Sequence, residues 1–115
     1  MLNVIRLDKP FGSDYDQHLL LSEILDQINV YDTRPKEEPG KAFDVRRDDV
    51  RFTLEPVFQH PLDGWLAFEA LNQLYELVLH NQARGLVALV ECDAVAYGRF
   101  SVRLVSGAPG VVERD

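Results

Sequence analysis

Alternation of apolar and polar positions defines the strands of this chain. Apolar residues recur at every second position in residues 43–45, 50–54 and 100–104, which is the period of a strand buried on one face. The aliphatic segment 2–7 ends in a turn-like stretch and predicts a first strand. Residues 86–92 are apolar on both faces, so they predict a central strand.

The parity of the apolar positions changes between Arg46 and Asp49. Odd-numbered positions are apolar before this point and even-numbered positions after it, so one straight strand would turn its apolar face over midway. A hairpin through residues 46–49 removes the conflict, and a single strand with a bulge would remove it too. A last strand is expected over residues 95–106, with Gly98 as a candidate bulge.

Two segments have the 3.6-residue period of helices. Ser13 is a candidate N-cap for a helix over about residues 14–29, whose apolar stripe is about 140° wide. Asp63 is a candidate N-cap for a second helix over residues 64–83, with Gly85 as its C-terminal stop. Apolar side chains fill about 220° of this second helix, whereas covering one sheet needs a stripe of ~100° or somewhat more.

The resulting element order is β-α-β-β-α-β-β. We expect an α+β domain over residues 1–106 with a ferredoxin-like two-layer architecture, in which an antiparallel sheet carries both helices on one face. Residues 107–115 are predicted to be a flexible C-terminal tail. Residues 31–41 are rich in proline and charge and are predicted to be a loop. The sequence leaves open whether this loop becomes ordered on binding.

Composition narrows the function classes. The chain has 115 residues, of which 46% are hydrophobic and 27% charged, as is typical of a soluble globular protein. No apolar run approaches the ~20 residues of a membrane-spanning helix, and the amino terminus lacks the pattern of a secretory signal. A single cysteine excludes an internal disulfide and a multi-cysteine zinc site, and we expect a cytoplasmic location.

Charge argues against a nucleic-acid partner. The 12 Lys and Arg residues are outnumbered by 19 Asp and Glu residues, which gives a net charge of −7. This field repels phosphates and favours encounter with a basic partner. Four arginines occupy outward strand positions and could line one face of the sheet: Arg46, Arg51, Arg99 and Arg103. The phenylalanines of the same strands fall on the opposite parity, so they could not stack RNA bases on that face.

The second helix has one apolar flank that its own domain is not expected to cover. This flank invites a second copy of the chain or a different protein. Its residues are Phe68, Tyr75 and Leu79. The alternative is that residues 56–62, which include three apolar side chains, fold back over it.

The outward side of the first helix is a second candidate surface. It groups Tyr15 and Leu19 with Glu23 and Asp26. An aromatic ring and a leucine surrounded by carboxylates could hold a basic, partly apolar partner. A lone exposed leucine, however, often has no function.

No catalytic or metal-binding motif is present in the sequence. The three histidines lack the spacing of a helical ligand pair, and the seven glycines are scattered singly, without a phosphate-binding loop. Cys92 lies between two carboxylates, which make a thiol a poorer nucleophile, so we interpret it as a packing residue. We therefore expect no catalytic residue, no bound metal and no cofactor.

These observations predict a non-catalytic, small acidic protein-interaction module that forms a homodimer. Inhibitors, immunity proteins, chaperones and phage accessory proteins are modules of this type. The alternative is a dimeric α+β barrel enzyme or a small-ligand-binding protein with a pocket between sheet and helices. The candidate pocket residues are His60, Trp65, Glu91 and Tyr97. The sequence does not identify the partner, the ligand or the biological process.

Overall fold

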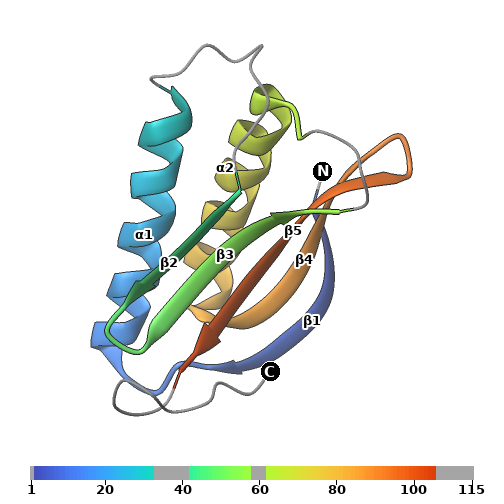
Figure 1. Ribbon diagram of the computed structural model, residues 1–115. Helices are drawn as coiled ribbons and strands as arrows, with labels where there is room; N and C mark the ends of the chain where they lie inside the picture. Colours follow the sequence, from blue (N-terminus) through green and yellow to red (C-terminus); the bar gives the residue numbers. More distant parts are fainter. Residues whose placement is uncertain (1, 33–41, 58–61, 106–115) are drawn as a thin grey trace.

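The chain forms one sheet with both helices packed on the same side of it (Figure 1). The computed structural model describes residues 2–32, 42–57 and 62–105. Within these ranges the elements follow the predicted order: β1 (Leu2–Pro10), α1 (Asp14–Asp32), β2 (Phe43–Arg47), β3 (Val50–Pro56), α2 (Gly64–Asn81), β4 (Arg84–Cys92) and β5 (Val95–Leu104). The predicted α+β class, with an antiparallel sheet and two helices, is confirmed.

The sheet has the strand order β1-β4-β5-β3-β2, and every neighbouring pair is antiparallel. The predicted ferredoxin-like arrangement is not confirmed. That arrangement places the first strand inside a four-stranded sheet. In this five-stranded sheet, β1 lies at an edge and pairs with β4, while β5 lies between β4 and β3. Periodicity locates the strands along the chain, but it carries no information about which strands become neighbours.

The apolar core lies between the sheet and the helices. Leu20 and Ile24 of α1 and Leu74 of α2 are fully buried there. They meet the apolar side chains of the strands, among which Phe52 is central. The Phe52 ring lies 4.9 Å from the ring of Phe43 and 5.7 Å from the ring of Phe100, measured between centroids. We call this side of the sheet the covered face and the opposite side the open face.

Asp63 and Ser13 accept hydrogen bonds from the first turns of their helices, as predicted for N-caps. The Oδ1 atom of Asp63 accepts a hydrogen bond of 2.7 Å from the backbone N–H of Trp65. The hydroxyl of Ser13 accepts a longer one, of 3.4 Å, from the backbone N–H of Asp16. These side chains satisfy backbone donors that have no partner within their own helix.

Gly85 does not terminate α2. The helix ends at Asn81, and Gln82 takes the positive φ angle of 67° that a glycine often supplies. Gly85 lies inside β4, where a Cβ atom would be 2.6 Å from Oδ2 of Asp8. A glycine at this position therefore allows the side chain of Asp8 to lie close to β4.

Residues 46–49 form the predicted hairpin. Arg47 lies opposite Val50, and Asp48 has a φ angle of 51° in the turn between them. The change of parity in the sequence is therefore a change of strand. The β4–β5 turn is formed by Asp93 and Ala94, which also have positive φ angles.

Bulges in β5 and β1 shift the alternation within strands, and β1 has a further register shift between Leu7 and Pro10. The first follows the prediction for Gly98: this residue lies opposite Val90, the next pair is Glu91 with Ala96, and Tyr97 is the extra residue. The second lies in β1, where Val4 is opposite Ala88 and Arg6 is opposite Val87, and the sequence does not predict it. Ile5 is the extra residue there.

Most residues of the predicted loop and tail lie outside the described ranges. Tyr31 is buried and belongs to α1, so the prediction of a loop beginning at residue 31 is wrong for Tyr31 and Asp32. Residues 33–41 and the predicted tail, 107–115, lie outside the described residues. Neither of the two described helices is both long enough and apolar enough to cross a bilayer.

Candidate functional site

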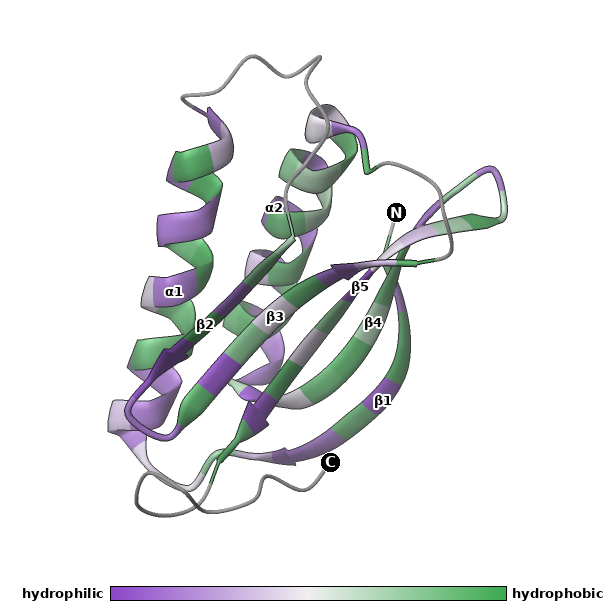
Figure 2. Cartoon of the chain, viewed as in Figure 1, coloured by the Kyte–Doolittle hydropathy of each residue, from purple (hydrophilic) through white to green (hydrophobic). Residues whose placement is uncertain are grey.

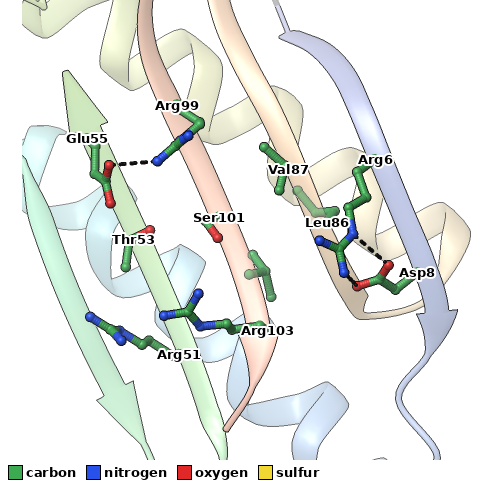
Figure 3. Close-up of a pocket in the computed structure, with 11 residues that line it drawn as sticks. Arg6, Asp8, Arg51, Thr53, Glu55, Leu86, Val87, Arg99, Ser101 and Arg103 are labelled. Atoms are coloured by element: carbon green, nitrogen blue, oxygen red, sulfur yellow. Dashed lines mark hydrogen bonds and ion pairs between the residues drawn. The ribbon is translucent and has the colours of Figure 1, made fainter. Parts of the chain in front are cut away.

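Residues of β3 and β5 line a hollow on the open face of the sheet. Figure 2 shows hydrophobic and hydrophilic residues alternating along both strands. The apolar set is buried on the covered face, so the polar set faces away from the helices. Arg51 lies opposite Arg103, Thr53 opposite Ser101, and Glu55 opposite Arg99. These six residues contribute to a hollow of about 350 Å³ (Figure 3).

The bulge in β1 brings a further arginine to this hollow. Without it, Arg6 would have the parity of Leu2 and Val4, which pack against the core. With Ile5 as the extra residue, Arg6 lies on the open face and lines the hollow together with Asp8. We call this site the arginine hollow: Arg6, Arg51, Arg99, Arg103, Asp8, Glu55, Thr53 and Ser101, on an apolar base from β4 and β5.

Ion pairs orient the arginines. Arg51 donates two hydrogen bonds to the Asp44 carboxylate, at 2.9 and 2.5 Å. This contact lowers the pKa of Asp44 and raises that of Arg51, because each charge is favoured by hydrogen bonding to the other. Arg99 donates to Glu55 at 2.9 Å.

Arg6 donates to Asp8, at 3.0 Å from Nε and 3.4 Å from Nη2. A carboxylate therefore directs each of three guanidinium groups around the hollow. Figure 3 shows the ion pairs of Arg6 and Arg99 on opposite sides of the hollow.

Thr53 supplies a buried hydroxyl at this site. The residue is 7% exposed, and its Oγ1 makes no hydrogen bond to any residue within the described ranges. A buried hydroxyl without a partner costs free energy, about 1–3 kcal/mol. Together with Ser101 on the neighbouring strand, it gives the hollow neutral donors as well as charged ones.

The surface predicted on α1 is largely used within the molecule. Leu19 and Glu23 were expected to face outward, but both are buried, and Glu23 is only 6% exposed. Arg47 of β2 donates to Glu23 at 2.7 Å and lies 3.5 Å from Asp26. The hairpin between β2 and β3 therefore covers this side of α1, which sequence periodicity could not reveal.

Tyr15 remains exposed and donates a hydrogen bond to Asp48, which raises the pKa of its phenol. Asp48 belongs to the turn of the same hairpin. Both ends of the predicted α1 surface therefore contact this hairpin.

The apolar flank predicted on α2 is partly exposed. Leu79 is 53% exposed, and Phe68 and Tyr75 are half-buried against the core. Trp65, which the sequence analysis assigned to a pocket, is 51% exposed on the same helix. We call these four residues the apolar flank.

The structure brings together two of the four candidate pocket residues. Trp65 and Tyr97 line a second hollow of about 470 Å³, with Glu69 and Cys92 among its other residues. Glu91 does not line this hollow; its carboxylate accepts a hydrogen bond of 3.2 Å from Asn3 of β1.

His60 lies outside the described residues. Cys92 is exposed, so its interpretation as a packing residue is wrong; it ends β4 beside an exposed turn. Among the described residues, no three His, Cys, Asp or Glu side chains gather closely enough to hold a metal ion.

Part of the arginine hollow could be predicted from the sequence. The alternation of β3 and β5 correctly assigned Arg51, Arg99 and Arg103 to one face. Arg6 was missed because its position depends on the bulge, and nothing in the sequence marks Ile5 as a bulged residue. Thr53 was missed although its parity was available, since it equals that of Arg51.

Comparison with family models, with curated proteins and with solved structures found no match to this chain. Function must therefore be inferred from the surfaces themselves.

Proposed function

We propose that this protein is a non-catalytic protein-interaction module that forms a homodimer through the apolar flank of α2. The observation that carries the proposal is the exposure of about half of Trp65 and of Leu79 on a helix whose other side fills the core. Contiguous exposed apolar surface on a small protein typically marks a contact with another molecule.

The residues of the apolar flank form one stripe along the helix. Trp65, Phe68, Tyr75 and Leu79 are joined through Asn72 by steps of three and four residues, which place side chains on the same side of an α-helix. Asn72 donates a hydrogen bond of 2.9 Å to the carbonyl of Phe68, so part of its polarity is satisfied within its own helix. Aromatic residues of this kind are enriched in protein interfaces.

The net charge limits where a second copy of the chain can bind. Two copies with a net charge of −7 repel one another, so they can associate closely only where carboxylates are absent. The stripe from Trp65 to Leu79 contains no charged residue, and Glu69 and Glu76 border it on the side of Trp65. Two-fold symmetric dimers, in which the same patch of both copies forms the contact, are also the commonest oligomers.

Light scattering coupled to size exclusion tests the dimer. The expected mass is twice the 13.1 kDa of one chain. Leu79→Asp should weaken dimerisation roughly tenfold or more, because it buries a charge in an apolar contact. Leu104→Asp is the matched control, since it places the same charge on an exposed leucine at the end of β5 and should leave the mass unchanged.

A wild-type mass of one chain throughout a concentration series would exclude the dimer. Equal dissociation by both variants would show that the apolar flank is not the contact. Circular dichroism of each variant establishes that the fold is retained.

A second candidate function is the binding of a small ligand in the hollow beside Trp65. Its volume, about 470 Å³, is in the range of small-molecule pockets, ~300–1,000 Å³, and it combines aromatic side chains with Glu69. Trp65 is the single tryptophan, so its fluorescence reports on this hollow directly. A library compound that changes this emission in the wild type but not in Tyr97→Ala would support the function. Compounds that act equally on both proteins would argue against it.

We further propose that the protein acts in the cytoplasm. This is supported by the exposed thiol of Cys92, because reducing compartments maintain free thiols. Secretion of the native protein into the culture medium or the periplasm, detected with an antibody, would contradict it.

A further inference from the structure

The open face concentrates positive charge in a protein that is acidic as a whole. Arg46 lies opposite Arg51, and Arg51 lies opposite Arg103, so three guanidinium groups cross β2, β3 and β5 in one row. Like charges directly opposite each other destabilise a sheet unless opposite charge compensates them. Asp44 compensates Arg51 through two hydrogen bonds. An anion in the arginine hollow would add compensation beside Arg51 and Arg103, which both line it.

The hollow also has unused hydrogen-bond donors. The bonds of Arg6 to Asp8 and of Arg99 to Glu55 use only some of the five N–H groups of each guanidinium. The remaining N–H groups of Arg6 and Arg99 have no acceptor in the described part of the chain. Thr53 adds a buried hydroxyl whose Oγ1 also lacks a partner there. Two arginines from β1 and β5 and a hydroxyl from β3 therefore form a set of donors suited to an oxyanion.

The number of donors favours phosphate over carboxylate. A guanidinium group matches both anions, but a phosphate group has more acceptor oxygens and carries up to two charges. It can therefore accept from several arginines and a hydroxyl at once. The lining has four arginines and two carboxylates, so its net charge is positive.

The size of the hollow favours a small ligand over a nucleic acid. A volume of about 350 Å³ is near the lower limit of small-molecule pockets, ~300 Å³. Binding of single-stranded RNA usually relies on aromatic rings that stack bases. The rings of Phe43, Phe52 and Phe100 instead pack together on the covered face.

We propose that the arginine hollow binds a small ligand that carries a phosphate or diphosphate group. Arg51 and Arg103 hold the anion from adjacent strands, and Arg6 and Arg99 donate to it from the sides of the hollow. Thr53 donates its hydroxyl. This site is on the opposite side of the sheet from the helices, so it does not depend on dimerisation through α2.

Calorimetric titration with inorganic pyrophosphate at low salt tests the site, together with NMR of the arginine Nε–H signals. The wild type should bind one pyrophosphate per chain and shift the signals of Arg6, Arg99 and Arg103. Arg99→Gln and Arg103→Gln should each weaken binding roughly tenfold or more. Arg103→Lys keeps the charge but loses the planar fork, so it should restore only part of the affinity.

Arg47→Gln is the matched control. It removes the same charge from a neighbouring strand, but Arg47 contacts Glu23 of α1 and does not line the hollow. The Arg47→Gln variant should bind pyrophosphate with the affinity of the wild type. The proposal is overturned by an absence of pyrophosphate binding, or by an equal loss in Arg47→Gln. Tighter binding of succinate or of a single-stranded RNA oligonucleotide would also overturn it. Thermal melting shows which variants are folded under the conditions of titration.

Discussion

The covered and open faces of the sheet come from the same strands but have opposite properties. On the covered face, Phe52, Leu54 and Phe100 are fully buried within the apolar core. On the open face, their immediate neighbours along the chain are arginines, hydroxyls and carboxylates joined in ion pairs. Burial of apolar area stabilises the first face. Exposed ion pairs contribute little, so the second face is available for binding.

This contrast predicts where substitutions are costly. Removing a buried side chain loses its transfer free energy and leaves a cavity. Removing an exposed polar side chain changes stability little, unless a charge is left buried without a partner. Three experiments test the contrast, beginning with the largest expected effect.

Phe52→Ala should destabilise the protein by about 3–5 kcal/mol. The Phe52 ring is fully buried and packs against both Phe43 and Phe100. The comparison variant is Ser101→Ala on the open face of the adjacent strand, for which we expect a change within about 0.5 kcal/mol. Urea unfolding followed by circular dichroism measures both. Similar losses in the two variants would show that the two faces do not differ in their contribution to stability.

Arg47→Met should cost about 1–3 kcal/mol, because Glu23 would remain buried without its ion pair. Arg47 belongs to a strand of the sheet but pairs with carboxylates of α1. Adding Glu23→Gln to this variant should recover part of the loss, because the buried charge is then removed. Thermal melts of the single and double variants measure this coupling. Strictly additive losses would contradict it.

Asp44→Asn should lower stability by less than about 1 kcal/mol at neutral pH, since its ion pair with Arg51 is partly exposed. The hydrogen bonds from Arg51 lower the pKa of Asp44 below its ordinary value of 3.8. Its contribution is therefore present above about pH 4 and is lost as the pH falls through the lowered pKa. The difference between variant and wild type should vanish at low pH.

The same variant tests the open face as a binding surface. Arg51 loses its carboxylate partner in Asp44→Asn, so the affinity for pyrophosphate should rise while stability falls slightly. A fall in affinity would mean that Asp44 is required to orient Arg51 rather than competing with the ligand.

Much of the local structure could be predicted from the sequence, because it depends on near neighbours in the chain. The parity change at residues 46–49 identified the hairpin, and Asp63 identified the start of α2. The order of strands could not be predicted, because it depends on packing between distant segments. The burial of Glu23 has the same origin, since it requires Arg47 from another element.

The candidate site was only half predictable. Alternation assigned three of its arginines, because alternation is a property of each strand alone. The position of Arg6 could not be predicted, because it depends on the pairing of β1 with β4, in which Ile5 is an extra residue. The exposure of the apolar flank likewise depended on how α1 packs against α2. Its apolar excess was visible in the sequence, but which side chains remained exposed was not.

The position of β1 and β2 as outer strands has a consequence for solubility. An outer strand can recruit strands from other molecules, which leads to fibres. β2 is only five residues long and carries three charged side chains. In β1, two register shifts interrupt the hydrogen-bonding ladder, and Pro10 has no N–H to donate. Both edge strands of the described sheet are therefore poor templates for further strands. The protein should therefore resist fibril growth at high concentration.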